Sequence, residues 1–136
     1  MTMVAEVMRM ANDPPKFFDY ANAKAHQLPC DYIEEAQLVG LRQRFAELRD
    51  RVAVLKATAD EQGIDRIDDI DQGANLLFPH TVYKSYPVSL LIKNRFDHMT
   101  KWLSRLTTTD FSNVDVSKCE GIDSWLQTLE DGVDVL

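Results

Sequence analysis

The sequence contains little cysteine, glycine or proline, and it has no long hydrophobic run. Its two cysteines, Cys30 and Cys119, form no C-x-x-C pair, which argues for reduced thiols and against a disulfide framework. Its five glycines are spread out and leave no glycine-rich loop whose backbone amides could wrap a phosphate. No segment approaches the roughly 18 consecutive apolar residues of a membrane span. The N-terminus carries Glu6 and Arg9 where a signal peptide has its apolar stretch. These absences predict a cytoplasmic protein with no membrane association.

The charge is negative overall and unevenly distributed. The net charge is −7, yet residues 1–106 hold 15 acidic and 14 basic side chains, whereas residues 107–136 hold seven acidic side chains and Lys118 as the one base. A nucleic-acid-binding protein needs a basic surface to displace counterions from phosphates, so we expect no nucleic-acid partner. The exception is residues 84–105, with five bases and Asp97 as the only acid. This stretch is either a solvated helix face or a docking surface for the acidic C-terminal segment or another anion.

Hydrophobic periodicity predicts an all-α fold. Residues 15–28 and 87–106 carry apolar side chains at helical spacing, each with a proline in the first turn. Asp123 can cap a further short helix near the C-terminus. The strongest pattern predicts one long amphipathic helix over residues 32–62, because apolar side chains recur there at alternate spacings of three and four residues. These side chains are Leu38, Leu41, Phe45, Leu48, Val52, Leu55 and Ala59.

The ends and the partners of the long helix can also be read from its sequence. Asp31 is expected as its N-cap with Glu34 completing a capping box, and Gly63 is expected to end it. The three-four spacing suits both a helical bundle and a coiled coil. We favour a helical bundle of about four to five helices that forms a single domain over residues 1–136, and a homodimer through the 32–62 helix is the alternative. Residues 107–136 are expected to be an acidic C-terminal segment or linker.

No complete active site or metal site can be recognised in the sequence. The six acidic side chains of residues 60–71 lack the spacing of a calcium loop. The three histidines include no pair at the i, i+4 spacing of a helical metal site. Motifs of nucleotide binding and of nucleophilic catalysis are missing as well. The sequence therefore predicts no catalytic residue, no metal site and no cofactor within these residues.

One short segment concentrates aromatic and polar side chains. Residues 79–87, PHTVYKSYP, join two helical stretches with a proline at each end. The tyrosines offer apolar bodies with polar tips, and the histidine and lysine could bind an anion or a carboxylate. The segment is therefore either a candidate binding site or a structural corner between helices, and the second interpretation is favoured. Its candidate residues are His80, Tyr83, Lys84, Ser85 and Tyr86.

A longer stretch around this segment resembles a known group of enzymes. Residues 76–131, LLFPHTVYKSYPVSLLIKNRFDHMTKWLSRLTTTDFSNVDVSKCEGIDSWLQTLED, resemble the N-terminal part of bacterial adenylate-forming enzymes. The group in question is related to phenylacetate–CoA ligase and to the acyl-protein synthetase of bacterial luminescence. The likeness covers roughly residues 64–132, and the string HTVYKSYP is its most specific part.

The resemblance implies a role in a larger enzyme. In such enzymes a Ser/Thr/Gly-rich phosphate loop follows this region, and no catalytic residue of the group maps onto any position of this sequence. We therefore expect the N-terminal helical segment of a larger acyl-CoA ligase or acyl-protein synthetase-like enzyme, partnered by the catalytic domain of the same polypeptide. The acyl substrate and the acceptor do not follow from the resemblance. The alternative is a free-standing helical module for protein interaction or self-association.

Overall fold

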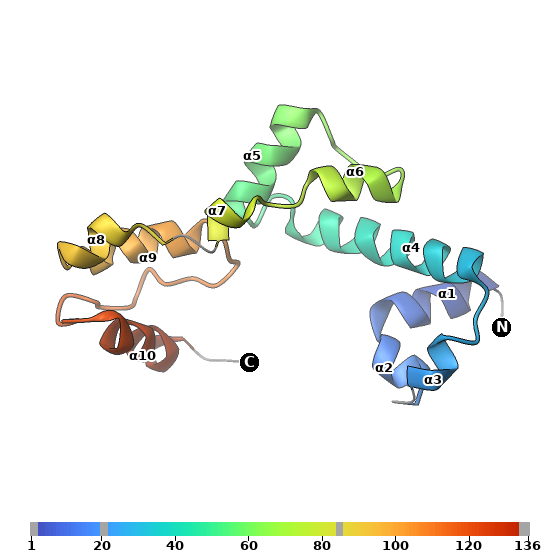
Figure 1. Cartoon of the computed structure of the whole chain (residues 1–136), viewed down its shortest axis with the longest axis horizontal. Coiled ribbons are helices and arrows are strands. Elements are labelled where there is room, and N and C mark those ends of the chain that lie inside the picture. The colour runs from blue at the N-terminus through green and yellow to red at the C-terminus, as the bar shows by residue number, and fades with distance from the viewer. Residues whose placement is uncertain (1–2, 20–21, 84–85, 134–136) are drawn as a thin grey trace. The chain divides into compact units, whose positions relative to one another are not determined.

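The computed structural model describes residues 3–19, 22–83 and 86–133, and every regular element in those ranges is a helix (Figure 1). The all-α prediction is therefore confirmed for this part of the chain. Several of the helices are single turns. They are α1 (Met3–Asn12), α2 (Pro14–Phe17), α3 (Asn22–Ala25), α4 (Cys30–Leu48), α5 (Ala53–Gln62), α6 (Ile70–Asn75), α7 (His80–Tyr83), α8 (Val88–Ile92), α9 (Phe96–Ser104) and α10 (Ile122–Gly132).

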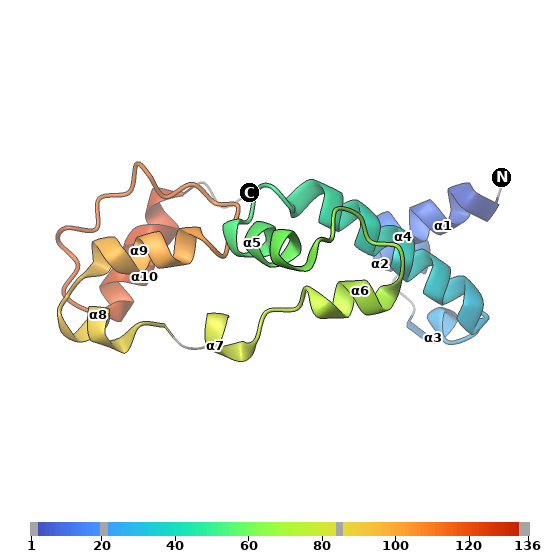
Figure 2. The same cartoon turned by 90° about the horizontal axis from the view of Figure 1, so that it is seen from above.

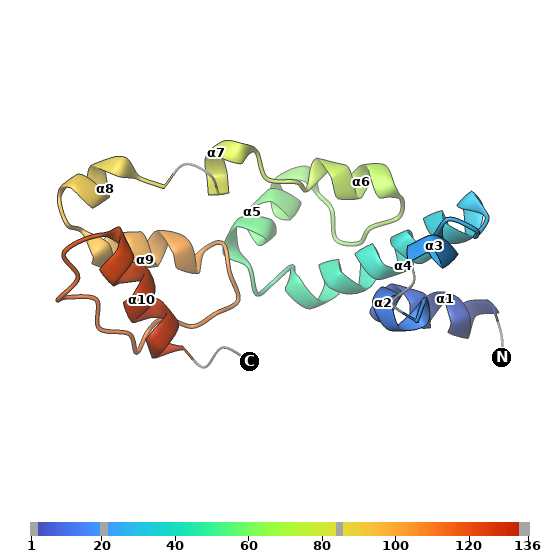
Figure 3. The same ribbon diagram turned by 60° about the horizontal axis from the view of Figure 1, so that its bottom comes forward.

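The chain divides into two compact units. Unit 1 consists of Met1–Glu47 and Ala59–Leu76, and unit 2 consists of Leu48–Thr58 and Leu77–Leu136, so that α5 contributes residues to both. Within unit 1, α1 and α2 lie beside α4, as Figure 2 shows. Within unit 2, α9 lies beside α10 and is preceded by α8 (Figure 3). The single domain expected over residues 1–136 stays a prediction.

The prediction of one long helix over residues 32–62 is wrong, because the structure has two helices in this range. Helix α4 ends at Leu48 and α5 begins at Ala53, with a turn in which the amides of Arg51 and Val52 both donate to the Leu48 carbonyl at 3.0 Å. The turn of four residues is about one helical turn long, so the apolar stripe keeps its phase across the break. Periodicity therefore could not reveal the break. Helix α4 also begins at Cys30, which places the predicted N-cap Asp31 inside the first turn.

The other two predicted helices are also interrupted, and this explains why the structure has more helices than the four to five expected. Residues 87–106 form α8 and α9, separated at Asn94, which has a φ of 51°. In residues 15–28, α2 is followed by Asp19 with a φ of 50° and then by the separate helix α3. Asparagine and aspartate enter this left-handed region more readily than other non-glycine residues, and one such residue stops a helix. The predicted helix near Asp123 is present as α10, but its N-cap is Gly121.

Unit 2 has a core that joins α9 to α10. The rings of Phe96 and Trp125 stack with centroids 6.5 Å apart, and Met99 is completely buried beside them. The indole Nε1 of Trp125 donates to the Thr100 hydroxyl at 2.9 Å, and this hydroxyl donates to the Phe96 carbonyl at 2.8 Å. The Trp125 indole nitrogen and the Thr100 hydroxyl thus both have hydrogen-bond partners, as buried polar groups require.

The acidic C-terminal segment contributes to this core. Residues 107–136 supply four of its buried side chains, which are Val116, Cys119, Trp125 and Leu129. Two aspartates of the segment stabilise its turns, because Asp110 accepts from the Ser112 amide at 2.8 Å and Asp115 accepts from the Ser117 amide at 2.9 Å. Hydrogen bonds from these serines lower the pKa of both carboxyls below the usual value. Part of the negative charge therefore belongs to turn formation.

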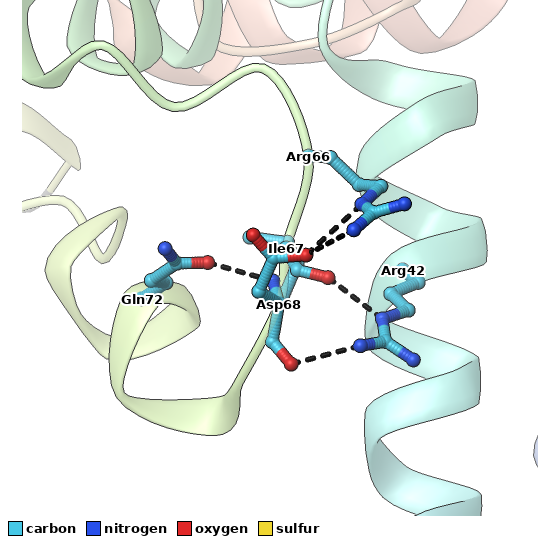
Figure 4. Close-up of polar contacts among 5 residues, drawn as sticks. All are labelled: Arg42, Arg66, Ile67, Asp68 and Gln72. Carbon is cyan, nitrogen blue, oxygen red and sulfur yellow. Dashed lines mark hydrogen bonds and ion pairs between the residues drawn. The ribbon is translucent and has the colours of Figure 1, made fainter.

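In unit 1, an arginine of α4 holds the loop that leads into α6. Figure 4 shows the Arg42 guanidinium reaching two carbonyls, with Nε donating to Ile67 at 2.7 Å and Nη2 donating to Asp68 at 2.8 Å. The side chain of Arg66 pairs with the Asp68 carboxylate, and the Asp68 amide donates to Gln72 (Figure 4). The carboxylate of Asp69 caps α6 by accepting from the Gln72 amide at 2.8 Å. The loop is thereby fixed in the conformation that buries Ile67.

We expect Arg42→Lys to lower the free energy of unfolding by about 1–2 kcal/mol, because a lysine cannot make both charge-assisted hydrogen bonds in this fork geometry. Arg44→Lys is the matched control, since Arg44 lies on the same helix and forms an exposed ion pair with Glu47 at 3.1 Å. The control should change the free energy by less than about 0.5 kcal/mol. Urea unfolding of the two variants measures the difference. Equal losses would show that the Arg42 contacts do not stabilise the loop.

Candidate functional site

The predicted site begins at the short helix α7. This helix follows Pro79, whose carbonyl accepts a hydrogen bond from the Val82 amide at 2.9 Å. His80 and Thr81 are exposed, whereas Val82 is half-buried. Tyr86, at the other end of the segment, is also exposed. The segment therefore combines one inward apolar side chain with outward polar ones.

The five residues proposed from the sequence do not all fall within the described structure. His80 and Tyr86 have described side chains. Lys84 and Ser85, together with the side chain of Tyr83, lie outside the described residues. The interpretation of this segment as a binding site or as a corner therefore depends on the residues around α7.

A cavity of about 270 Å³ lies beside α7, within unit 2. Three different parts of the chain line it, and most of its wall is apolar. The amide of Val54 in α5 donates to the carbonyl of Arg105 at 3.2 Å, which joins α5 to the end of α9 at this point. The lining residues are Val54, Thr81, Val82, Trp102, Arg105 and Leu106.

The parts of unit 2 that line the cavity are strongly basic. Residues 48–58 and 77–106 together contain eight basic and two acidic side chains. One of the acids is Asp50, which pairs with Arg49 at 3.0 Å and with Lys56 at 3.5 Å. Residues 107–136 of the same unit add seven acidic side chains and Lys118, so unit 2 as a whole is balanced at nine acidic and nine basic side chains, and the excess of positive charge is local to these ranges.

The second acid is also neutralised by its neighbours. Both nitrogens of the Arg95 fork donate to the Asp97 carboxylate at 3.1 Å, and the His98 imidazole lies 3.3 Å from it. The hydrogen bonds from Arg95 lower the pKa of Asp97 to about 2. By contrast, within the part of the chain that the structure describes, the Arg105 guanidinium forms no hydrogen bond or ion pair. Arg105 is therefore available to a ligand in the cavity.

The described side chains that line this cavity are suited to binding. Within the described residues, the lining contains no carboxylate, imidazole or thiol of the kind that serves as a general base or nucleophile. The polar groups of its side chains are the Thr81 hydroxyl, the Trp102 indole nitrogen and the Arg105 guanidinium. Such a set can hold and orient a molecule, and it has no group that would activate one.

No metal centre is found in the described ranges 3–19, 22–83 and 86–133, which contain no group of three or more histidine, cysteine, aspartate or glutamate side chains placed to hold an ion. Cys30 is exposed and Cys119 is buried, with its sulfur 3.5 Å from the Thr128 hydroxyl. No helix in those ranges is both long enough and apolar enough to cross a membrane.

A second cavity of about 270 Å³ lies in unit 1, between α1, α2 and α4. Its lining is apolar except for Gln37, and it includes Met10, Phe18 and Ile33. It contains no charged group that would select among ligands. The cavity beside α7 is therefore the better candidate for a specific site.

Comparison with known proteins gives no identification, because no protein-family model, no curated protein and no solved structure matches this chain.

Sequence reasoning singled out residues 79–87, which contain α7, but it predicted neither this helix nor the cavity beside it. Trp102 and Leu106 were assigned to the apolar face of a helix, and Arg105 to a basic stretch. Their placement beside α7 comes from tertiary packing, which the spacing of apolar residues does not report. Val54 comes from a distant part of the chain, and nothing in its sequence context pointed to the cavity. The excess of basic residues was the one signal that could have indicated an anion site.

Proposed function

We propose that this chain is the helical N-terminal domain of an enzyme that activates acyl or aryl carboxylates by adenylation, and that it supports the catalytic domain without being catalytic itself. The observation that carries the proposal is the resemblance of residues 76–131 to the corresponding region of such enzymes. The partner is the catalytic domain of the same polypeptide, and the site of action is the cytoplasm.

The packing of the resembling residues supports a structural role. Nearly the whole segment belongs to unit 2. Residues 115–117, Asp-Val-Ser, contribute Val116 to the core. Residues 122–125, Ile-Asp-Ser-Trp, form the start of α10 and contribute Trp125. His80, Thr81 and Tyr86 of its most specific string are exposed, but Val116 and Trp125 are buried, so this later part of the resemblance concerns residues that build the fold. This is what a supporting domain requires.

Helix α8 offers a surface on which a catalytic domain could pack. Leu90 and Leu91 pack against the core of unit 2, while Val88 and Ile92 are 54% and 77% exposed. These two side chains are four residues apart and therefore lie on one side of the helix. Large apolar side chains exposed together are typical of a surface that contacts another protein.

We expect the 136-residue chain alone to show no carboxylate-dependent exchange of pyrophosphate into ATP. Adenylation needs preorganised donors around the triphosphate and a carboxylate held in line with the α-phosphate. The five glycines of this chain lie far apart, so it lacks an amide-rich loop for the phosphates. The assay compares the chain with the product of its complete reading frame. Exchange above background by the chain alone would contradict the proposal, and exchange by the longer product alone would support it.

A second candidate function is a free-standing module for protein interaction or self-association, favoured by the same exposed side chains of α8. The stripe of residues 38–59 offers less surface to a second copy, because each of its side chains is buried or half-buried. Analytical ultracentrifugation of the chain and of Ile92→Asp separates the two candidates. A dimer that Ile92→Asp dissociates would favour self-association, whereas a monomer in both cases would favour the supporting domain.

A further inference from the structure

We infer that the cavity beside α7 binds a small organic monoanion, with an aromatic body against the apolar wall and an oxyanion head group on the Arg105 guanidinium. This inference goes beyond the proposed function, because it assigns a ligand site to this domain itself. It rests on the lining of the cavity and on the charge around it, and it does not depend on the resemblance.

The size of the cavity sets the size of the ligand. A cavity of about 150 Å³ lined by apolar side chains accepts benzene. The cavity beside α7 is about 270 Å³ and is open to solvent, with Thr81 and Arg105 at its exposed edge, so it can receive one face of a body of roughly two fused rings without enclosing it. The Trp102 indole provides a flat aromatic surface, against which another ring stacks favourably. Val54, Val82 and Leu106 complete the apolar wall.

The charge of the cavity sets the charge of the ligand. Among the described residues of the lining, Arg105 is the one that carries a charge, and its guanidinium has no partner within the described part of the chain. A guanidinium donates two parallel hydrogen bonds to a carboxylate, sulfonate or phosphate oxygen pair. Thr81 adds a hydroxyl that can donate to the same head group. Asp50 and Asp97, the two acids of residues 48–58 and 77–106, are both held in ion pairs with neighbouring bases.

Naphthoate is a suitable probe, because its body has two fused rings and its head group carries one negative charge. The chain has two tryptophans, Trp102 in the cavity lining and Trp125 in the core. Protein labelled with fluorotryptophan therefore gives one fluorine NMR signal for each, and Trp102→Phe assigns them. We expect naphthoate to shift the Trp102 signal saturably and to leave the Trp125 signal unchanged. Naphthalenesulfonate and naphthyl phosphate, tested in parallel, show which oxyanion head group is preferred.

Variants separate the proposed site from nonspecific attraction to a basic surface. Arg105→Gln should weaken naphthoate binding by about threefold to tenfold, the effect of losing one partly solvated ion pair. Lys93→Gln removes the same charge from an exposed residue before the first turn of α9, whereas Arg105 follows the last turn, and it should change binding by less than twofold. Neutral naphthalenemethanol should bind the wild-type chain as weakly as naphthoate binds Arg105→Gln. Far-ultraviolet circular dichroism confirms that both exposed-site variants remain folded.

Three results would overturn the inference. They are the absence of a saturable shift at Trp102, equal binding of naphthoate and naphthalenemethanol, and equal losses in Arg105→Gln and Lys93→Gln. Because the experiment uses the 136-residue chain and measures binding, its outcome is separate from that of the pyrophosphate exchange assay. The cavity could bind an anion in a domain that supports no ligase, and the supporting domain could exist without a ligand in this cavity.

Discussion

Replacing Trp125 with alanine is expected to lower the free energy of unfolding by about 3–5 kcal/mol, the range for removing a buried aromatic side chain from a core. Trp125 is 3% exposed, stacks on Phe96 and satisfies the Thr100 hydroxyl through its indole nitrogen. Its removal leaves a cavity between α9 and α10 and takes away the partner of a buried hydroxyl. Denaturant unfolding followed by circular dichroism measures the change.

Leu126→Ala is the matched control for Trp125→Ala. Leu126 is the next residue of α10, and it is 45% exposed. The substitution should therefore change the free energy of unfolding by less than about 1 kcal/mol, because much of the side chain is already in water. If Trp125→Ala and Leu126→Ala had similar effects, α10 would not be packed through the face described above.

In unit 1, Ile67→Ala is expected to lower the free energy of unfolding by about 2–5 kcal/mol, the usual range for truncating a buried isoleucine. The Ile67 side chain is completely buried, and its carbonyl accepts the hydrogen bond from Arg42. The loop is thus held from both sides, by packing of the side chain and by bonding of the backbone. Ile67→Ala removes the packing of the side chain and keeps the hydrogen bond from Arg42 to the backbone carbonyl.

Ile70→Ala provides the comparison, because Ile70 lies three residues further on and is 42% exposed. It should cost less than about 1 kcal/mol. The two residues are of the same type and differ in burial, so the difference between the two variants tests the packing seen in the structure. If residues 1–136 form a single domain, Ile67→Ala and Trp125→Ala will each shift one common unfolding transition.

The class of the fold could be predicted from the sequence, but the number of helices could not. Apolar spacing reports which side chains point inward, and it does so across the break between α4 and α5 because that break spans about one helical turn. The interruptions at Asp19 and Asn94 depend on a single backbone conformation at each residue. Aspartate and asparagine also occur within ordinary helices, so their presence alone does not predict a break.

The site could be predicted only at its first element. The composition of residues 79–87 indicated a segment of interest, and α7 forms within it. The rest of the cavity comes from α5 and from the end of α9, which are brought to α7 by tertiary packing. The importance of Arg105 also could not be seen in the sequence, since it depends on which of several neighbouring bases lacks a partner. Arg95 forms an ion pair with Asp97, whereas Arg105 has no partner among the described residues.

The most direct test of the proposed function is to read the natural transcript that encodes this chain, downstream of the codon for Leu136. A supporting domain of an adenylate-forming enzyme must be joined to the residues that bind ATP. We predict that the reading frame continues without interruption into a loop rich in glycine, serine and threonine. A stop codon directly after Leu136 would contradict the proposal and leave the free-standing interaction module as the better account.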